Sequence, residues 1–273
     1  MPYADISDDV SLFYTEHGEG GLPILLVHGW ACDSNDWIWQ IPELAKRHKV
    51  YAVDLRGHGH SSVTQDGYRG TDYAKDLSRL IAALVCGPVV VVGHSLGGYI
   101  GAHLAVEHPE DVLALVCIDP SYAPSIAAPD PSELISVLRS EACHDLMQQL
   151  FTGFAAADTP AHLTTWHQRR LLTVPQHVIS ESIAGMVTDN VPNLDAEMLR
   201  RRSCPTLTFF RSATDSAWED AAAGSGRGKT VTWDESGHWL HQEKPAAFNA
   251  ILEDWLDEIR PAISKIRPKT LIG

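Results

Sequence analysis

One serine lies in a sequence context that favours nucleophilic chemistry. Ser95 is the central residue of Gly93-His-Ser-Leu-Gly97, which follows four consecutive valines and precedes a stretch typical of a helix. A strand, a tight turn and a helix in this order hold the serine in a strained conformation and lift its hydroxyl above the edge of a sheet. Glycines two residues before and after it remove Cβ atoms that would clash there. The pattern lacks the lysine and the glycine spacing of phosphate-binding loops. It predicts a nucleophilic serine.

A serine hydroxyl needs a base to take its proton. His238 stands in Ser236-Gly-His-Trp-Leu-His241, between the last predicted strand and the closing helix, whereas His241 falls inside that helix. The carboxyl ends of parallel strands meet at one edge of a sheet, so a histidine at this place can reach Ser95 despite the distance in sequence. We therefore expect His238 to be the base.

A carboxylate at another strand end should hold the imidazole in the correct tautomer and stabilise the imidazolium. Asp215 follows the predicted strand that ends at Phe210, and it is the first choice for this acid. Asp119 ends the strand Val112 to Ile118 and is the alternative. The chain order serine, aspartate, histidine holds with either residue.

The tetrahedral oxyanion formed by serine attack needs two backbone N–H donors. The N–H of Leu96 directly follows the nucleophile, at the start of a helix whose dipole acts in the same sense. Trp30 follows the apolar run Pro23 to Val27 and the pair His28-Gly29, and the glycine lets the chain turn in closely. Leu96 and Trp30 are the predicted oxyanion hole.

The elements that must position these residues alternate between strands and helices. Apolar runs too short for helices lie at 23–27, 50–53, 89–92 and 112–118, with helical patterns at 37–48, 71–84 and 96–108 between them. Runs of this kind are typical of strands buried on both faces of a parallel sheet. An edge hairpin is expected before them, within 6–14. The pattern predicts an α/β domain whose helices cover both faces.

The alternation stops after Asp119-Pro120. From 121 to 202 the sequence has no buried strand, only helical patterns such as 134–154 and 161–172 broken by prolines. Strands resume at 205–210 and 229–233, and a helix with an apolar face follows at 246–259. We expect one α/β core made of residues 1–120 and 203–273, interrupted by a helical insertion at 121–202.

These landmarks resemble the α/β-hydrolase superfamily. The resemblance rests on His28-Gly-Trp30, Asp54-Leu-Arg-Gly-His-Gly59, Gly93-His-Ser-Leu-Gly-Gly98 and Gly237-His238, and it covers most of 20–120 and 203–260. It implies a mostly parallel eight-stranded sheet flanked by helices, with a helical cap inserted after the sixth strand and a catalytic triad at the carboxyl edge of the sheet. The superfamily usually has glycine three residues before the acid after strand seven, where this chain has Ser212. Some members place the acid after strand six, which keeps Asp119 as an alternative.

The substrate chamber is expected between Ser95 and the cap, with an aromatic lining. Its predicted residues are Trp30, Trp37, His94, Tyr99, Tyr122, Trp166, Met186 and Trp239. The function favoured is a serine hydrolase that cleaves a carboxylic ester or lactone of a mid-sized, partly aromatic small molecule through an acyl-enzyme. One alternative is a cofactor-independent dioxygenase of the same fold, in which a His238–Asp119 pair acts on a 3-hydroxy-4-quinolone-type ring. Another is a non-catalytic binding module built on this scaffold.

Composition excludes several other classes. There are 21 Lys and Arg against 35 Asp and Glu, a net charge of −14, which disfavours nucleic acids and anionic membrane surfaces as partners. Five scattered cysteines and the absence of a signal-like N-terminus favour a cytoplasmic protein without disulfides. The expected partner is a small-molecule substrate, and the chain is expected to be a monomer or a homodimer. No cofactor is expected. Asp54 and Arg56 are expected to satisfy groups of a buried turn, and His58 and His60 lack the further ligands of a metal site.

Overall fold

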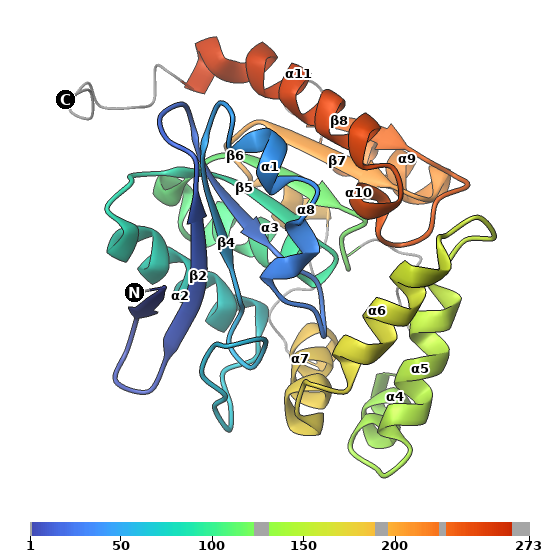
Figure 1. Ribbon diagram of the computed structural model, residues 1–273. Helices are drawn as coiled ribbons and strands as arrows, with labels where there is room; N and C mark the ends of the chain where they lie inside the picture. The colour runs from blue at the N-terminus through green and yellow to red at the C-terminus, as the bar shows by residue number, and fades with distance from the viewer. Residues whose placement is uncertain (1, 123–130, 189–195, 224–227, 264–273) are drawn as a thin grey trace.

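A single sheet organises the molecule. In this computed structural model, which describes residues 2–122, 131–188, 196–223 and 228–263, eight strands form one sheet in the order β1-β2-β4-β3-β5-β6-β7-β8 (Figure 1). The strands are β1 (Tyr3–Asp5), β2 (Ser11–His17), β3 (Pro23–Val27), β4 (Lys49–Val53), β5 (Val89–His94), β6 (Val112–Ile118), β7 (Thr206–Phe210) and β8 (Gly228–Thr232). β1 and β2 form an antiparallel hairpin, β2 is antiparallel to β4, and β3 to β8 run parallel to one another. This confirms the predicted fold class.

The central strands are apolar throughout because both faces of the sheet are covered. Successive side chains point to opposite faces, and the core divides accordingly. Leu25, Val27, Val91 and Leu115 belong to one buried cluster, with the apolar face of α2 (Gly70–Leu84) and with α3 (Leu96–Glu107). The alternate residues of the same strands pack in a second cluster with α11 (Pro245–Ile263). Figure 1 shows α11 above the sheet and α2 and α3 on its other side.

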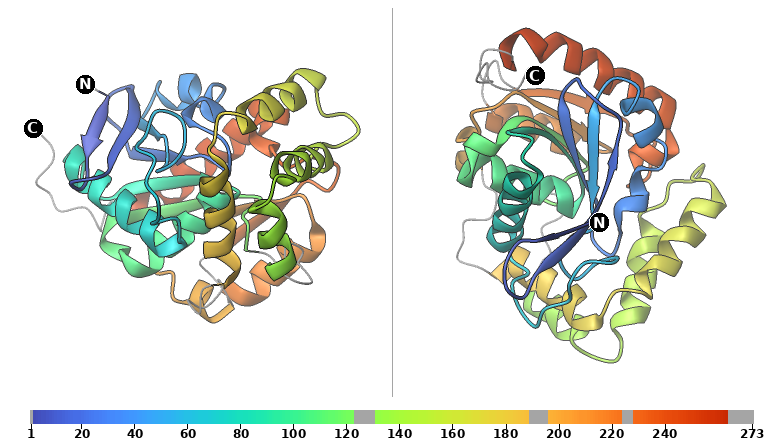
Figure 2. Two further views of the ribbon diagram at one scale, coloured as in Figure 1. Left: turned by 90° about the horizontal axis from the view of Figure 1, so that it is seen from below. Right: turned by 60° about the vertical axis from the view of Figure 1, so that its left-hand side comes forward.

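The segment between β6 and β7 is helical where the structure describes it. Its helices are α4 (Pro131–Leu138), α5 (Cys143–Gly153), α6 (Ala161–Leu171), α7 (Gln176–Thr188) and α8 (Ala196–Arg200). Both views in Figure 2 show α4, α5, α6 and α7 grouped to one side of the sheet. The remaining short elements are η1 (Ser34–Trp37), α1 (Ile41–Leu44), η2 (Pro109–Asp111), α9 (Ala213–Ala223) and α10 (Leu240–Glu243).

Three helical predictions need correction. The helix expected over 37–48 is only η1 and the one-turn α1, with a proline in the first turn of α1. The helix expected over 134–154 is two helices. Between them the Ser140 hydroxyl donates to the Val137 carbonyl (2.8 Å) and accepts from the Ala142 N–H (3.2 Å), and such local bonds compete with helix continuation. The helix α9 was not predicted, and it contains Asp215.

Two negative findings complete the fold. Within the described residues no helix is both long enough and apolar enough to cross a membrane. All five cysteines lie in the described part of the chain, and none of them is in a disulfide.

Candidate active site

Ser95 has the strained turn geometry predicted for it. It joins β5 to α3 with φ 52° and ψ −115°, a conformation that disfavours residues with a side chain. A Cβ at Gly93 would lie 2.3 Å from the Gly97 carbonyl oxygen, and one at Gly97 would lie 2.2 Å from the Val27 carbonyl oxygen. The two glycines therefore allow the turn to pack against β3, and the predicted strand, turn and helix are confirmed.

His238 is fixed through its backbone and its ring. It lies between β8 and α10, where its N–H donates to the Phe154 carbonyl (2.8 Å) and its own carbonyl accepts from His94 Nε2 (2.9 Å). Its Nδ1 is 2.5 Å from Oδ2 of Asp119. Because Nδ1–H donates to this carboxylate, the neutral ring keeps its lone pair on Nε2.

Of the two candidate acids, the structure pairs Asp119 with His238. Asp119 follows β6 with φ 42°, and its N–H donates to the Phe209 carbonyl (2.8 Å). Arg211 Nε pairs with the same carboxylate oxygen at 2.9 Å. Asp215, the first choice, is in the first turn of α9, where its N–H donates to Ser212 Oγ (3.3 Å), and it lines the same cavity. The pairing corrects the order of the two sequence-based choices.

Ser95 and the His238–Asp119 pair open into a cavity of about 540 Å³. The Ser95 hydroxyl lies 3.1 Å from the Ser121 hydroxyl in this cavity. Trp30 and Leu96, the predicted oxyanion hole, also line it. A Cβ at Gly29 would be 3.2 Å from Ser95 Cβ, so this glycine permits the close approach of the Trp30 segment. The predicted nucleophile, base and oxyanion residues thus meet at one place.

The lining is apolar on the side of the helical segment and mixed toward the sheet. Helices α4, α5 and α7 contribute Leu134, Leu150, Phe151, Ile183 and Met186, with Phe154 just after α5. Polar side chains at or after the ends of β6, β7 and β8 line the other side: Ser121, Arg211, Ser212, Asp215, Asp234 and Ser236. The volume is ordinary for a small-molecule site.

Half of the predicted pocket residues line this cavity: Trp30, His94, Met186 and Trp239. The other four do not. Trp37 is fully buried against His241, and Tyr99 packs edge-on against His103. Tyr122 contacts Trp218, and Trp166 contacts Trp39 and the Arg170 guanidinium. Each of the four is packed against other side chains instead.

Two aromatic lining residues, Phe151 and Phe154, were not singled out from the sequence. Phe151 and Phe154 lie 5.5 and 6.0 Å, ring to ring, from Trp239, and Phe154 is 4.7 Å from His238. The apolar face of the helix predicted over 134–154 contains both residues and indicates that they are buried. That pattern cannot show which face turns toward the nucleophile.

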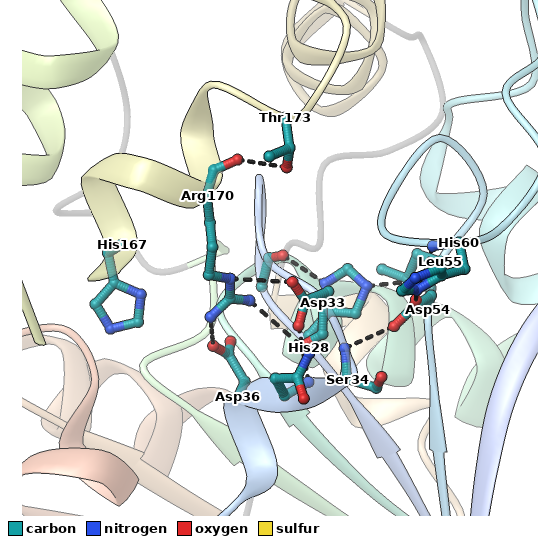
Figure 3. A network of polar contacts seen from close by, with 12 residues as sticks. His28, Asp33, Ser34, Asp36, Asp54, Leu55, His60, His167, Arg170 and Thr173 are labelled. Atoms are coloured by element: carbon teal, nitrogen blue, oxygen red, sulfur yellow. Dashed lines mark hydrogen bonds and ion pairs between the residues drawn. The ribbon is translucent and has the colours of Figure 1, made fainter. Parts of the chain in front are cut away.

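The turn after β4 has the structural role predicted for it. Asp54 accepts from the N–H groups of Ser34 (2.7 Å) and His60 (2.9 Å), and Arg56 pairs with Asp76 through two bonds of 2.6 and 2.7 Å. Figure 3 shows Asp54 together with His28, whose Nε2 accepts from the Leu55 N–H at 2.9 Å. These bonds brace the loops that carry the site.

A second polar network, also in Figure 3, joins α6 to the loop after β3. Arg170 bonds Asp36 and Asp33, and all three side chains are largely buried. Burial alone would raise the pKa of Asp36, but the Arg170 guanidinium holds it far below its ordinary value. Gln242 of α10 donates to Oδ1 of Asp36 at 3.0 Å, and Arg170 bonds the same oxygen. Asp36 therefore connects α6, η1 and the segment that follows His238.

Burial also lowers the pKa of several histidines. Loss of hydration disfavours the charged imidazole, and it lowers the pKa of His58 and of His241 to about 3 and that of His167 to about 4. The pKa of His94 and that of His28 are lowered for the same reason. These imidazoles are neutral at pH 7.

The fold and the geometry of Ser95, His238 and Asp119 define an α/β architecture with a strained serine turn at the carboxyl edge of its sheet. Residues 23–203 match the family model of the α/β-hydrolase fold. This chain belongs to the α/β-hydrolase fold family.

Individual relatives are enzymes of several kinds. The chain is 31% identical to a non-heme chloroperoxidase of Kitasatospora aureofaciens over 60% of its length and 63% of the relative's. It is 32% identical to a bifunctional esterase/perhydrolase of Acinetobacter calcoaceticus over 62% of its length and 68% of the relative's. The chain thus spans about two thirds of these relatives. Among solved structures, it resembles a thermophilic esterase from Thermogutta terrifontis at 25% identity, with a TM-score of 0.79 over 92% of this chain and 94% of the esterase.

Proposed function

We propose that this protein is a serine hydrolase that cleaves a carboxylic ester or lactone of a mid-sized, partly aromatic small molecule. The observation that carries the proposal is the meeting, in one largely apolar cavity, of a serine on a strained elbow and a hydrogen-bonded histidine–aspartate pair. The similarity to esterases supports the same chemistry.

In the proposed mechanism His238 takes the proton of Ser95 as the hydroxyl attacks the substrate carbonyl. Asp119 holds the Nδ1 proton of His238 and stabilises the imidazolium. The N–H groups of Leu96 and Trp30 stabilise the tetrahedral oxyanion. The imidazolium then protonates the leaving alcohol, an acyl-enzyme forms, and water activated by His238 releases the acid.

The helical segment is proposed to act as a cap on a core formed by 1–120 and 203–273. Its Leu134, Phe151 and Met186 supply an apolar wall opposite Ser95. Aromatic and aliphatic walls of this kind favour a substrate with an apolar or aromatic body. The rim carries Asp215 and Asp234 as well as Arg211, which disfavours substrates with several negative charges.

The proposal is tested by covalent labelling and by turnover of an activated aryl ester. A fluorosulfonyl or phosphonate probe should label Ser95, as located by mass spectrometry, and the label should disappear in His238→Ala. Ser95→Ala should lower kcat/KM by about 10³-fold or more. Ser212→Ala is the matched control, because Ser212 lines the same cavity but is held against α9. Full turnover by Ser95→Ala would refute the acyl-enzyme.

One observation favours a second candidate, a cofactor-independent dioxygenase acting on a 3-hydroxy-4-quinolone-type ring. The carboxylate paired with His238 follows β6, as that alternative requires. In that reaction the pair removes a substrate proton and Ser95 only donates a hydrogen bond. Oxygen uptake with such a quinolone that survives Ser95→Ala but not His238→Ala would establish the dioxygenase in place of the hydrolase.

A further inference from the structure

Next to the active-site cavity, which His94 lines, three ligand-bearing side chains from distant segments converge. Asp36 lies in η1, His94 is the last residue of β5, and His241 lies in α10. Each is fully buried, with 0% of its surface exposed. One ligand atom from each lies within 4.8 Å of those of the other two.

Several atoms of this cluster have no hydrogen-bond partner among the described residues. They are Oδ2 of Asp36, Nδ1 of His94 and both ring nitrogens of His241. A buried polar atom without a partner costs about 1–3 kcal/mol, so four in one cluster favour a site that binds a ligand. Three of the four atoms, a carboxylate oxygen and two ring nitrogens, have free lone pairs, which suits a metal ion.

The tautomer of His94 fits this requirement. Its Nε2 lies 2.9 Å from the His238 carbonyl, which can only accept, so Nε2 carries the hydrogen. The lone pair is left on Nδ1. An imidazole that donates one nitrogen to a carbonyl and offers the other to an ion is the arrangement typical of metal-binding histidines.

The carboxylate of Asp36 is oriented in the same way. Arg170 and Gln242 both bond Oδ1, which leaves Oδ2 available. Asp33 also pairs with Arg170, at 3.2 Å, so the two carboxylates and one guanidinium carry a net charge of −1. A divalent cation would therefore bind next to a group of net negative charge, and electrostatic attraction would favour its binding.

We propose that Asp36, His94 and His241 bind a first-row divalent metal ion, for which Zn²⁺ is the probe. Two imidazole nitrogens and one carboxylate oxygen are donors that zinc accepts, with bonds of about 2.0–2.2 Å and ligand atoms about 3.4 Å apart. The side chains must close by roughly an ångström from the spacing seen here. Water completes the coordination.

The role of this ion is structural. All three side chains are fully buried, and of the three only His94 lines the active-site cavity, so we assign the ion to the support of the site and not to the reaction. It joins the loop after β3, the residue before Ser95 and the helix after His238, and His94 holds the His238 carbonyl at the same time. The ion would stabilise these loops whichever reaction Ser95 and His238 perform.

The test uses the full chain after dialysis against a chelator. With one equivalent of Zn²⁺ followed by desalting, elemental analysis should find about one zinc per chain, and the melting temperature should rise by roughly 5 °C or more. His241→Phe, which keeps an aromatic ring between Trp37 and Phe248, should lose both effects. The absence of retained zinc and of a thermal shift in the wild type would mean that only ordered water satisfies these atoms, and would overturn the proposal.

Two further measurements separate this site from the other clusters in the described residues that could hold a metal. His108, Glu110 and Asp111 form a surface group, so His108→Asn should retain zinc and its thermal shift. Cys32, Asp36 and His167 form another, and a zinc–sulfur distance of about 2.3 Å in the X-ray absorption spectrum of the wild type would assign the metal there. Loss of zinc in His108→Asn, retention in His241→Phe or a sulfur ligand would each refute the site, and the spectrum applies even if a variant does not fold.

Discussion

Two residues other than glycine mark the site by their backbone conformation. Ser95 and Asp119 have φ angles of 52° and 42°, at the carboxyl ends of the neighbouring strands β5 and β6. Such conformations cost about 1–3 kcal/mol each and persist where the surrounding structure imposes them. The Ser95 N–H donates to the Ile118 carbonyl (2.8 Å), and the Ser121 N–H donates to the Ser95 carbonyl (3.3 Å). The two strained turns are therefore tied together, which holds a hydroxyl and a carboxylate at one edge of the sheet.

At this scale the two carboxylates can be distinguished by substitution. Asp119→Asn should lower kcat/KM for an aryl ester by about 10²–10⁴-fold, because an amide cannot stabilise the imidazolium or fix the tautomer of His238. Asp215→Asn should change it by less than about tenfold. The measurement is the pair of kcat/KM values, with melting temperatures to confirm folding. A larger loss of kcat/KM in Asp215→Asn than in Asp119→Asn would show that Asp215, in α9, is the catalytic acid.

At the scale of elements, the sequence predicts the buried strands well and the helical segment less well. The run Pro23–Val27 and the run Val112–Ile118 are β3 and β6 to the residue, because strands buried on both faces are continuous apolar runs. The choice between Asp119 and Asp215 was not available from the sequence. Both follow strands at the same edge, and only tertiary packing shows that His238 reaches the end of β6.

The helix α6 is joined to the core by a buried ion pair. Arg170→Met should lower the free energy of unfolding by about 3–5 kcal/mol, because it leaves Asp36 buried without its counter-charge. Chemical denaturation gives the value. Arg139→Met is the matched control, since Arg139 pairs with Glu181 between α4 and α7 at the surface and should cost less than about 1 kcal/mol. Equal losses in the two variants would show that the Arg170–Asp36 pair contributes no more than an exposed one.

At the scale of the whole molecule, the loops around the sheet edge contain an unusual number of buried neutral histidines. His28 and His58 face each other with ring centroids 5.2 Å apart, and both are fully buried. Nδ1 of His58 donates to the Arg56 carbonyl at 2.9 Å, and Nε2 of His28 accepts from the Leu55 N–H. The His28 bond needs a lone pair on Nε2 and therefore a neutral ring, and burial favours the neutral form of His58, so the fold depends on pH through groups remote from the nucleophile.

That dependence has a definite sign. The pKa of His58 is about 3 in the folded protein and about 6.5 when unfolded, so between these values the unfolded chain binds more protons. The contribution of the neutral His58 ring to the free energy of unfolding is fully present above about pH 6.5. It falls as the pH is lowered, by up to about 1.4 kcal/mol per pH unit. The free energy of unfolding, measured by denaturant titration from pH 7.5 to pH 5, should therefore decrease.

His58→Asn tests this dependence, because it can keep the donor to Arg56 but cannot titrate. The slope of its free energy of unfolding against pH should be smaller than the wild-type slope by the equivalent of about one proton. Parallel curves for wild type and His58→Asn would show that His58 does not contribute to the acid sensitivity of the fold.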